Sequence, residues 1–409
     1  MRTTKFLFAS GMAACLLYGS QTPSHSVANW ARKYGVECSA CHSPAVPRLN
    51  KTGHQFRKMG FRMESEIGQQ PEYKEIGEFL SFRQRTRYQV TNNPGGANRP
   101  LDNEFRFNDA TLFYEGAITP VLTAMVELEV EGKDTISPQF YGSWTKGDLG
   151  NYWSARFGRL GSVRSGYGGF DRPTGISTPS ILNMDLTGGA GNSALKLGGK
   201  SLGIEVNRGW DQDNRVYLEV RNGTDSLVGD DNVNGGLDKD FLLAYERLVD
   251  ERGSAFTLFG YSGAAHLDVD GDGAITAADG TDTVSQVDTL RLGGTFSYIT
   301  KTAGDQLPWE IQGGLVYAKD DAPAGDTKGD GFYLQVQKNL PKNAAAFLRY
   351  DKVDDDGGRA AGDTSEWITL GGVRTVSNNW RIAAELQHRD RDFDAEKQTQ
   401  LTLESMLVW

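Results

Sequence analysis

Short runs in which apolar and polar residues alternate fill most of this chain. From about residue 74 onward the runs are separated by breaks rich in Gly, Asp and Asn, and helical periodicity is weak. Clear runs span residues 79–90, 105–117, 122–130, 153–160, 215–220, 241–248, 256–261, 289–298, 309–317, 332–336, 344–350, 367–373 and 380–387. With weaker runs near Phe140 and Leu195 and a final run at the C-terminus, the pattern predicts about sixteen antiparallel strands.

The spacing of the runs predicts a mainly β fold, an antiparallel membrane β-barrel of about 16 strands that follows a small N-terminal α-helical domain. Roughly 335 residues give about 21 residues per strand and connection, which is typical of outer-membrane barrels. Arg83, Arg85 and Arg87 share one face of the first run, and such a face suits a water-filled lumen rather than lipid. A soluble β-sandwich or β-helix stays open as the alternative.

The breaks between the runs fall into two classes of length, as membrane barrels require. Short breaks, which we expect to be periplasmic turns, lie at 119–120, 250–252, 341–343 and 377–379. Long acidic breaks, which we expect to be extracellular loops, lie at 229–240, 267–286, 320–330 and 351–364. The alternation of the two classes supports the barrel.

The final run ends in an aromatic residue. Counting back in twos from Trp409 gives Leu407, Ser405, Leu403 and Leu401, an apolar row that is broken once. Such a row faces lipid when the strand belongs to a barrel. An amphipathic strand with a terminal aromatic residue resembles the assembly signal of bacterial outer-membrane proteins.

The N-terminus matches a secretory signal peptide. Arg2 and Lys5 form a short basic region, residues 6–18 are apolar, and small residues at 26–28 suit a signal peptidase. The apolar run is too short to span a membrane. A lipobox at residues 12–15 is the alternative, but the apolar residues that follow it argue against that reading.

One motif carries specific chemistry: a C-x-x-C-H run formed by Cys38, Cys41 and His42. This run is the attachment site of a c-type heme, in which both thiols form thioethers and the histidine binds the iron from one side. A zinc site needs a second pair of ligands, for which only His54 lies nearby, and a redox-active dithiol needs a βαβ context. The motif therefore predicts one covalent heme c and one-electron transfer.

These features divide the chain into a signal peptide at 1–28, a monoheme cytochrome c domain at 29–73 and a porin-like barrel at 74–409. About 45 residues bury little apolar surface alone. We therefore expect the heme and the barrel interior to complete the core of the small domain. That requirement places the domain in or against the barrel lumen.

The second iron ligand has three candidates, which are Met63, Met59 and His54. Met63 ranks first and Met59 second. A thioether ligand raises the heme potential, whereas a second imidazole keeps it low. Apolar residues recur at helical spacing over residues 50–59, which predicts a short helix there.

A second motif lies in one of the long breaks and matches a calcium-binding loop. Asp268, Asp270 and Asp272 occupy its first, third and fifth positions, and the Ala274 carbonyl can supply a further oxygen. Asp279 stands at the last position, where an EF-hand has Glu. Bound Ca²⁺ would cross-link an exposed loop. A solvated acidic loop is the alternative, and the oxygen ligands would also accept other divalent cations, iron included.

The charge composition of the chain bears on which partners it could bind. The formal net charge of −10 argues against nucleic acid. The acidic breaks would concentrate cations near the mouth of a pore. Outer-membrane lipid is the partner expected for the outer face of the barrel.

The heme segment resembles a known family, the fused monoheme cytochrome–porins of the bacterial outer membrane, which include iron oxidases of iron-oxidising bacteria. The similar residues are 31–42, 46–50, Gly53, Phe56, Gly60 and Phe61. Cys38, Cys41 and His42 carry over directly, and over the barrel the resemblance is only architectural. The calcium-like loop is not a feature of that family.

The resemblance implies outer-membrane electron transfer. Extracellular Fe(II) would give an electron to the heme, which would pass it to a periplasmic c-type cytochrome, so that the protein would act as an Fe(II) oxidase. No iron(II) site carries over to the barrel. Two alternatives stay open: a substrate porin with a heme plug or sensor domain, and electron export to an extracellular acceptor.

Overall fold

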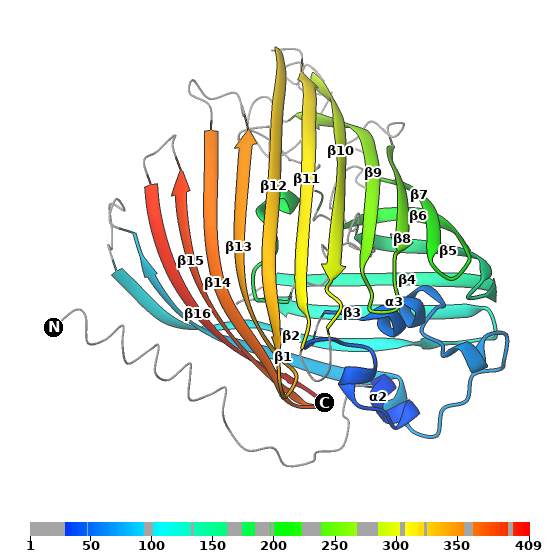
Figure 1. The fold of residues 1–409 in the computed structure, drawn as a ribbon. Helices are drawn as coiled ribbons and strands as arrows, with labels where there is room; N and C mark the ends of the chain where they lie inside the picture. Colours follow the sequence, from blue (N-terminus) through cyan, green and yellow to red (C-terminus); the bar gives the residue numbers. More distant parts are fainter. Residues whose placement is uncertain are drawn as a thin grey trace.

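The computed structural model describes residues 29–46, 48–93, 101–131, 135–161, 174–184, 197, 200–222, 239–267, 285–302, 307–322, 325–355, 363–391 and 396–409. Their strands form a closed antiparallel barrel (Figure 1). Each strand pairs with the next strand along the chain, and β1 pairs with β16 to close the wall. Closure leaves no strand edge unpaired, which is what a barrel in lipid requires.

Sixteen strands make up the described wall, as the alternation predicts. They are β1 Leu80–Asn92, β2 Leu101–Ala117, β3 Leu122–Glu131, β4 Thr135–Asp148, β5 Asn151–Gly161, β6 Lys200–Trp210, β7 Asn214–Arg221, β8 Asp240–Leu248, β9 Ala255–Leu267, β10 Ser285–Ile299, β11 Trp309–Ala322, β12 Gly325–Leu340, β13 Ala344–Asp355, β14 Asp363–Ser377, β15 Trp380–Arg391 and β16 Glu396–Val408. Three of the four predicted short turns lie between strands that these bounds define, and the fourth, at 377–379, begins with Ser377, the last residue of β14.

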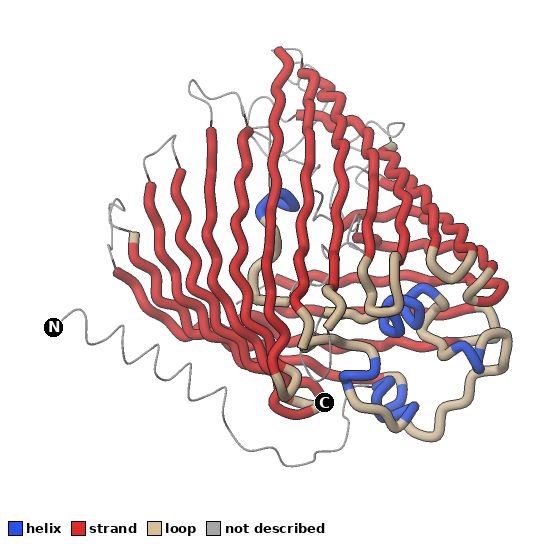
Figure 2. Tube along the Cα trace, viewed as in Figure 1, coloured by secondary structure: helices blue, strands red, loops and turns tan. Residues whose placement is uncertain are grey.

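The described helices are short, and none of them forms part of the wall (Figure 2). They are α2 Asn29–Tyr34, η1 Cys38–Ala40, α3 Lys51–Lys58, η2 Glu64–Glu66, η3 Ile76–Glu78 and η5 Ser180–Asn183. The helix predicted over residues 50–59 is confirmed as α3. No helix in the described part of the chain is long and apolar enough to cross a membrane.

Two of the predicted long loops are wrong in their bounds. Strand β11 runs on to Ala322 and β12 begins at Gly325, so the acidic stretch 320–330 is almost entirely strand. Strand β13 continues to Asp355, which shortens the break predicted at 351–364. The cause is the polar lumen: Asp320 is buried there and its carboxylate binds the Arg291 guanidinium at 2.5 Å. Acidic residues that face a lumen look like loop residues in a one-dimensional pattern.

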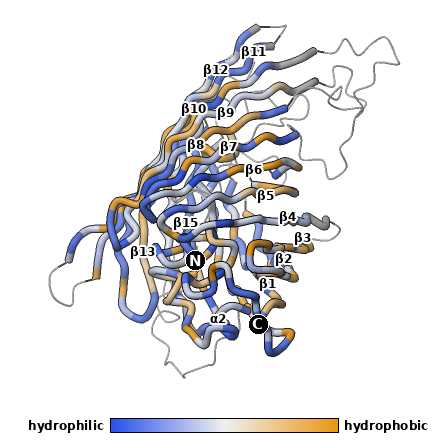
Figure 3. Tube along the Cα trace, turned by 90° about the vertical axis from the view of Figure 1, so that its right-hand side faces the viewer, coloured by the Kyte–Doolittle hydropathy of each residue, from blue (hydrophilic) through white to orange (hydrophobic). Residues whose placement is uncertain are grey.

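The two faces of the wall differ in polarity. In β8, Asp240, Leu242 and Glu246 are buried, whereas the intervening Phe241 and Leu243 are exposed to 51% and 56%. Strand geometry puts alternate residues on opposite faces, so the exposed apolar residues lie on the outside. The hydropathy colouring of the strands alternates accordingly along many of them (Figure 3).

The outer face forms an apolar belt. Leucine, isoleucine, valine and aromatic side chains are exposed on almost every strand; among them are Leu112, Leu128, Ile204, Leu218, Leu258, Leu292, Leu315, Leu334, Leu348, Ile368 and Leu370. Exposed aromatic residues lie toward many strand ends, for instance Trp144, Trp153 and Trp309 at the ends with short turns and Phe105 and Phe241 toward the other. This arrangement is that of barrels that cross a lipid bilayer.

The last strand follows the predicted alternation. Thr402, Glu404 and Met406 are buried, and the residues between them are more exposed. Ser405, the one break in the apolar row, accepts a hydrogen bond of 3.0 Å from the Trp380 indole N–H. The Trp409 ring lies 4.6 Å from that of Phe82 on β1, so aromatic packing reinforces the β1–β16 seam.

A charge in the middle of the belt tests its role. Leu370, near the centre of β14, is 57% exposed, and we expect Leu370→Arg to lower the free energy of unfolding by about 2–4 kcal/mol in lipid vesicles. Leu101→Arg, at the first residue of β2, should cost less than about 1 kcal/mol because strand ends lie near water. Urea unfolding measures both. Equal costs would contradict a lipid-covered belt.

Candidate functional site

Residues 29–46 and 48–79, which we call the plug, fill one mouth of the barrel. Helix α2 lies at the end of the molecule where β16 ends (Figure 1). This is the end with the short turns between strands. The plug carries the C-x-x-C-H motif, so the candidate site lies inside the rim of the barrel.

Cys38, Cys41 and His42 lie on one tight turn. Cys38 begins η1, and the backbone N–H groups of Cys41 and His42 both donate to the Cys38 carbonyl, at 3.2 Å and 2.9 Å. The His42 ring places Nδ1 3.2 Å from the Arg48 carbonyl oxygen. Since a carbonyl only accepts, Nδ1 is the donor, and Nε2 is the ring nitrogen that could bind a metal.

Asn50 holds this turn against α3. Its side-chain oxygen accepts from the Gly53 N–H at 3.0 Å and caps the helix. Its side-chain amide donates to the carbonyls of Ser39 and Ala40, and its backbone N–H donates to the Cys41 carbonyl at 3.0 Å. One residue therefore fixes both the helix start and the motif.

Helix α3 ends in a turn that needs glycine. The Phe61 N–H donates to the Phe56 carbonyl at 2.9 Å and the Gly60 N–H to the Arg57 carbonyl at 3.3 Å, the pairing of a Schellman motif. Gly60 has a φ of +68°, which side chains disfavour. The turn directs the Phe61 ring back toward Phe56, 6.1 Å between centroids.

An aromatic cluster joins the plug to the wall. The Trp30 ring stacks on that of Phe61 at 4.6 Å and meets Phe56 edge-on at 5.0 Å. Met125, Tyr141 and Leu160 of the wall complete the buried cluster. Each buried aromatic ring contributes about 1.5–3 kcal/mol, so this cluster seats the plug.

The three candidates for the second iron ligand lie in different surroundings. Met63 packs, partly buried, against the aromatic cluster. Met59 caps the end of α3 with its side chain 1% exposed. His54 is buried and lines a cavity of about 20 Å³ together with Arg156 and Arg215 of the wall. A cavity of that size holds about one water molecule.

Polar contacts anchor the plug around the whole rim. Two are ion pairs: Lys58 with Glu246 on β8, and Arg48 with Glu310 on β11. The others are hydrogen bonds that the plug donates: from Asn29 to the Glu115 carbonyl on β2, from Arg62 to the Leu122 carbonyl and the Thr123 hydroxyl on β3, from the Val46 N–H to the Thr375 hydroxyl on β14, and from the Cys38 thiol to the Asn378 carbonyl beside β15. Burial lowers the pKa of Lys58 well below its usual value, although Glu246 at 2.8 Å opposes that shift. The plug is thus fixed to strands distributed around the wall.

Neither cysteine of the motif forms a disulfide. Burial, and then the neighbouring Cys41, raise the pKa of the Cys38 thiol to about 11, and burial also raises the pKa of Cys41. Both thiols are therefore protonated at neutral pH. Two free thiols on one turn, and a histidine oriented through Nδ1, form a donor set that fits a covalent heme c.

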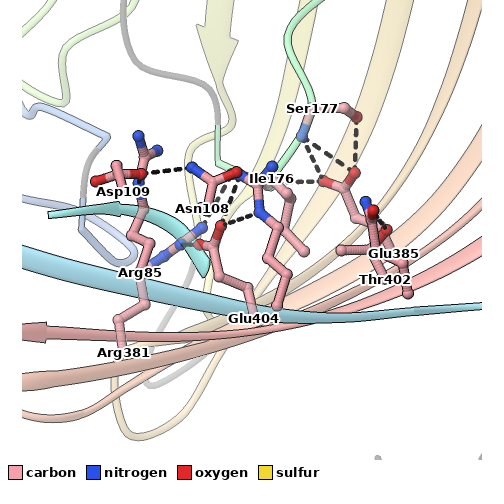
Figure 4. A network of polar contacts seen from close by, with 12 residues as sticks. Arg85, Asn108, Asp109, Ile176, Ser177, Arg381, Glu385, Thr402 and Glu404 are labelled. Carbon is pink, nitrogen blue, oxygen red and sulfur yellow. Dashed lines mark hydrogen bonds and ion pairs between the residues drawn. The ribbon is translucent and has the colours of Figure 1, made fainter. Parts of the chain in front are cut away.

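A second segment, residues 174–184, folds into the barrel from the long connection between β5 and β6; we call it the inner segment. The Glu385 carboxylate on β15 accepts from the backbone N–H of Ile176 and from the N–H and hydroxyl of Ser177, the last at 2.7 Å (Figure 4). Arg381 donates to the Gly175 carbonyl at 2.9 Å. These bonds hold the inner segment firmly to the wall.

Apolar packing holds the inner segment against the wall of the lumen. Ile181, Leu182 and Met184 are almost fully buried in one cluster with residues from β7, β8, β9, β11, β12 and β13. A cavity of about 410 Å³ remains between the inner segment and the wall, lined by residues that include Met184, Trp367 and Gln387. Its charged residues, Arg349 and Asp351, bind each other at 2.7 Å and both bind the inner segment.

The three arginines of β1 face the lumen, as their shared face predicts. Arg83 binds Asp109 at 3.2 Å and Glu129 at 2.7 Å, Arg85 binds the same two carboxylates, and Arg87 binds Glu404 at 2.7 Å. Figure 4 shows part of this network, with Arg85, Asp109 and Glu404. Their described partners belong to the wall.

Several predicted site residues cannot be placed. Asp268, Asp270, Asp272, Ala274 and Asp279 of the calcium-like loop lie outside the described residues. Within the residues described, no group of three or more His, Cys, Asp or Glu side chains could hold a metal ion.

Sequence reasoning missed Arg48 and Glu310. Their side chains meet at 2.7 Å inside the barrel, 3% and 1% exposed. Glu310 alternates with Trp309 and Ile311, which marks it as facing the lumen. That alternation carries no information about its partner, which lies 262 residues earlier.

Comparison with known proteins bears on the barrel. No family model and no curated protein matches the chain. Among solved structures, the anion-selective porin from Comamonas acidovorans aligns with a TM-score of 0.58 at 13% identity, over 81% of this chain and 98% of that one. A loop-deletion mutant of OmpT, an outer membrane protein of Vibrio cholerae, aligns with a TM-score of 0.55 at 13% identity, over 81% and 99%. The chain therefore has the closed barrel fold of porins.

The contact between α3 and the motif gives a test of the plug. A Cβ on Gly53 would lie 2.3 Å from the Cys41 carbonyl oxygen, so we expect Gly53→Ala to destabilise the plug by about 1–3 kcal/mol. Gly372→Ala is the matched control, because its Cβ would meet nothing nearer than 3.6 Å. Limited proteolysis of both variants reports the seating of the plug. Equal resistance would contradict the close packing.

Proposed function

We propose that this protein lies in the bacterial outer membrane, carries one covalent heme c and transfers electrons from extracellular Fe(II) to a periplasmic c-type cytochrome. One observation carries the proposal: Cys38, Cys41 and His42 share a turn in the mouth of a closed barrel, with His42 Nδ1 on the Arg48 carbonyl. The resemblance of this segment to cytochrome–porins supports the identity of the donor.

The wall supports the location. Its apolar belt, its exposed aromatic residues toward the strand ends and its charged lumen are the features of barrels in lipid. Most connections on one side are short turns and most on the other are longer, as on periplasmic and extracellular faces. On this assignment the exposed side of the plug faces the periplasm, where a soluble cytochrome can reach it.

The residues of the plug have distinct roles in the proposal. Cys38 and Cys41 would hold the heme through thioethers, and His42 would bind the iron through Nε2. Bound there, the heme supplies one-electron oxidation and reduction. Met63, at the edge of the aromatic cluster, is the second ligand that we propose, ahead of Met59 and His54. Ca²⁺ in the 268–279 loop remains a separate structural proposal.

The filled lumen favours electrons over solutes as the species that cross. The plug occupies the short-turn end, and the inner segment packs against the wall of the lumen. Acidic loops would raise the local concentration of Fe²⁺.

Mixing Fe(II) with the purified ferric protein tests the electron donor. We expect the Soret band to shift to that of the reduced heme in a stopped-flow experiment within the working pH range. Zn²⁺ is the control, because it has the same charge and no redox chemistry. A heme that stays oxidised in the presence of Fe(II) would contradict iron oxidation and leave the two alternatives.

The first alternative is a substrate porin with a heme plug or sensor domain. It is favoured by the similarity of the wall to an anion-selective porin and by the cavity of about 410 Å³ beside the inner segment. The second alternative, electron export, uses the same heme in the opposite direction. The heme potential relative to the extracellular acceptor distinguishes export from iron oxidation.

Conductance distinguishes the porin alternative. We expect the full chain in planar bilayers to show no steady pore current, because the plug and the inner segment both obstruct the lumen. The Comamonas porin, measured in the same bilayer, is the positive control for an open barrel. A steady current of comparable size would contradict the electron conduit and support solute transport.

A further inference from the structure

A continuous set of contacts links the wall of the barrel to the imidazole of His42. It begins at Glu310 on β11, passes through the side chain and backbone of Arg48, and ends at His42 Nδ1. Both charged side chains are almost completely buried. The contacts therefore lie in a low-dielectric interior, where hydrogen bonds and charges act strongly.

The Arg48 carbonyl is held in place from several sides. It accepts from His42 Nδ1 at 3.2 Å and from the Ser43 N–H at 3.2 Å. His42 and Leu49 also form an isolated antiparallel bridge. The orientation of the imidazole thus depends on where the backbone of Arg48 lies.

The Arg48 side chain fixes that backbone to the wall. Its guanidinium reaches Glu310 Oε1 at 2.7 Å through Nη2 and 3.3 Å through Nε, and the Ser297 hydroxyl oxygen at 3.0 Å. Several donors support the carboxylate in turn: the Ser297 hydroxyl and the Gln312 amide at 2.7 Å each, and the Gln337 amide at 3.2 Å. Three neighbouring strands, β10, β11 and β12, therefore hold one plug residue.

We propose that Glu310 and Arg48 are positioning residues that set the basicity and orientation of His42, and through it the potential of the bound heme. The inference rests on the proposed function, since it requires the heme. A hydrogen bond from the second ring nitrogen of a ligating histidine to a carbonyl raises the basicity of the ligand. A more basic ligand stabilises the ferric heme and lowers its potential.

The burial of this ion pair fits a positioning role better than a stabilising one. Buried ion pairs add little to stability, because removing two charges from water offsets their attraction. Nonetheless Ser297, Gln312 and Gln337 all donate hydrogen bonds to this one carboxylate. Such a fully connected network fixes geometry, and the geometry that it fixes here is the carbonyl beside His42.

The decisive measurement is the midpoint potential of the holoprotein with its low-spin ferric EPR spectrum. We expect Glu310→Gln to shift the potential to a more positive value and to change the g values, which report the axial ligand field. The neutral double variant Arg48→Met with Glu310→Gln separates positioning from charge. If displacement of the Arg48 carbonyl causes the shift in potential, the shift should persist in the double variant. If only the uncompensated charge of Arg48 causes it, the shift should vanish there.

Two further variants keep the test sharp. Glu246→Gln is the matched control, because it removes the wall carboxylate of another buried ion pair of the plug, Lys58–Glu246. No described contact connects that pair to His42. The heme potential and g values of this variant should therefore stay near those of the native protein. Ser297→Ala weakens the network without leaving an unpaired charge, and should shift the potential in the same direction if Glu310→Gln does not fold.

The possible results separate the inference from the proposed function. Purified protein without covalent heme, by the pyridine hemochrome spectrum, would overturn both. Covalent heme with unchanged potential and g values in Glu310→Gln and Ser297→Ala, or with a shift that vanishes in the double variant, would overturn only the positioning role. A shift that persists in the double variant, with none in Glu246→Gln, supports it.

Discussion

The structure depends on one constraint: a charged side chain that points into the lumen is costly to bury unless a partner of opposite charge meets it there. The inner face of the wall carries arginines and carboxylates on most strands, and water cannot solvate them fully once the lumen is filled. Pairs across neighbouring strands, such as Arg291 with Asp320 and Arg381 with Glu404, meet this need at 2.5 Å each. The plug and the inner segment supply further partners, such as Lys58 for Glu246 and Ser177 for Glu385.

Both inserts are therefore bound by the polarity of the lumen as much as by apolar contact. Lys58 and Arg48 of the plug each meet a wall carboxylate, and the inner segment offers backbone N–H groups to Glu385. Where the wall is apolar, the inserts present apolar side chains instead, as at Phe56 and Ile181. The inserts match the wall region by region, which explains how a lumen sized for a porin becomes filled.

The sequence predicts the wall better than its contents. Alternation with a period of two locates the strands, because one face of each strand lies in apolar surroundings. The C-x-x-C-H motif can be identified from sequence because all its ligands lie within five consecutive residues. Asp320 and Asp351 show the limit: charge in a lumen and charge in a loop look alike until the opposite strand is known. The Arg48–Glu310 pair could not be predicted from sequence for the same reason, since 262 residues separate its members.

The rim contacts of the plug also constrain the order of assembly. They fall on β2, β3, β8, β11 and β14, strands distributed around the wall, and Arg48 ends among residues that face inward. No single hairpin could hold the plug in its final position. The plug must therefore complete its seating as the β1–β16 seam closes or after it, so that a heme attached to the free segment would enter the barrel already bound to its turn.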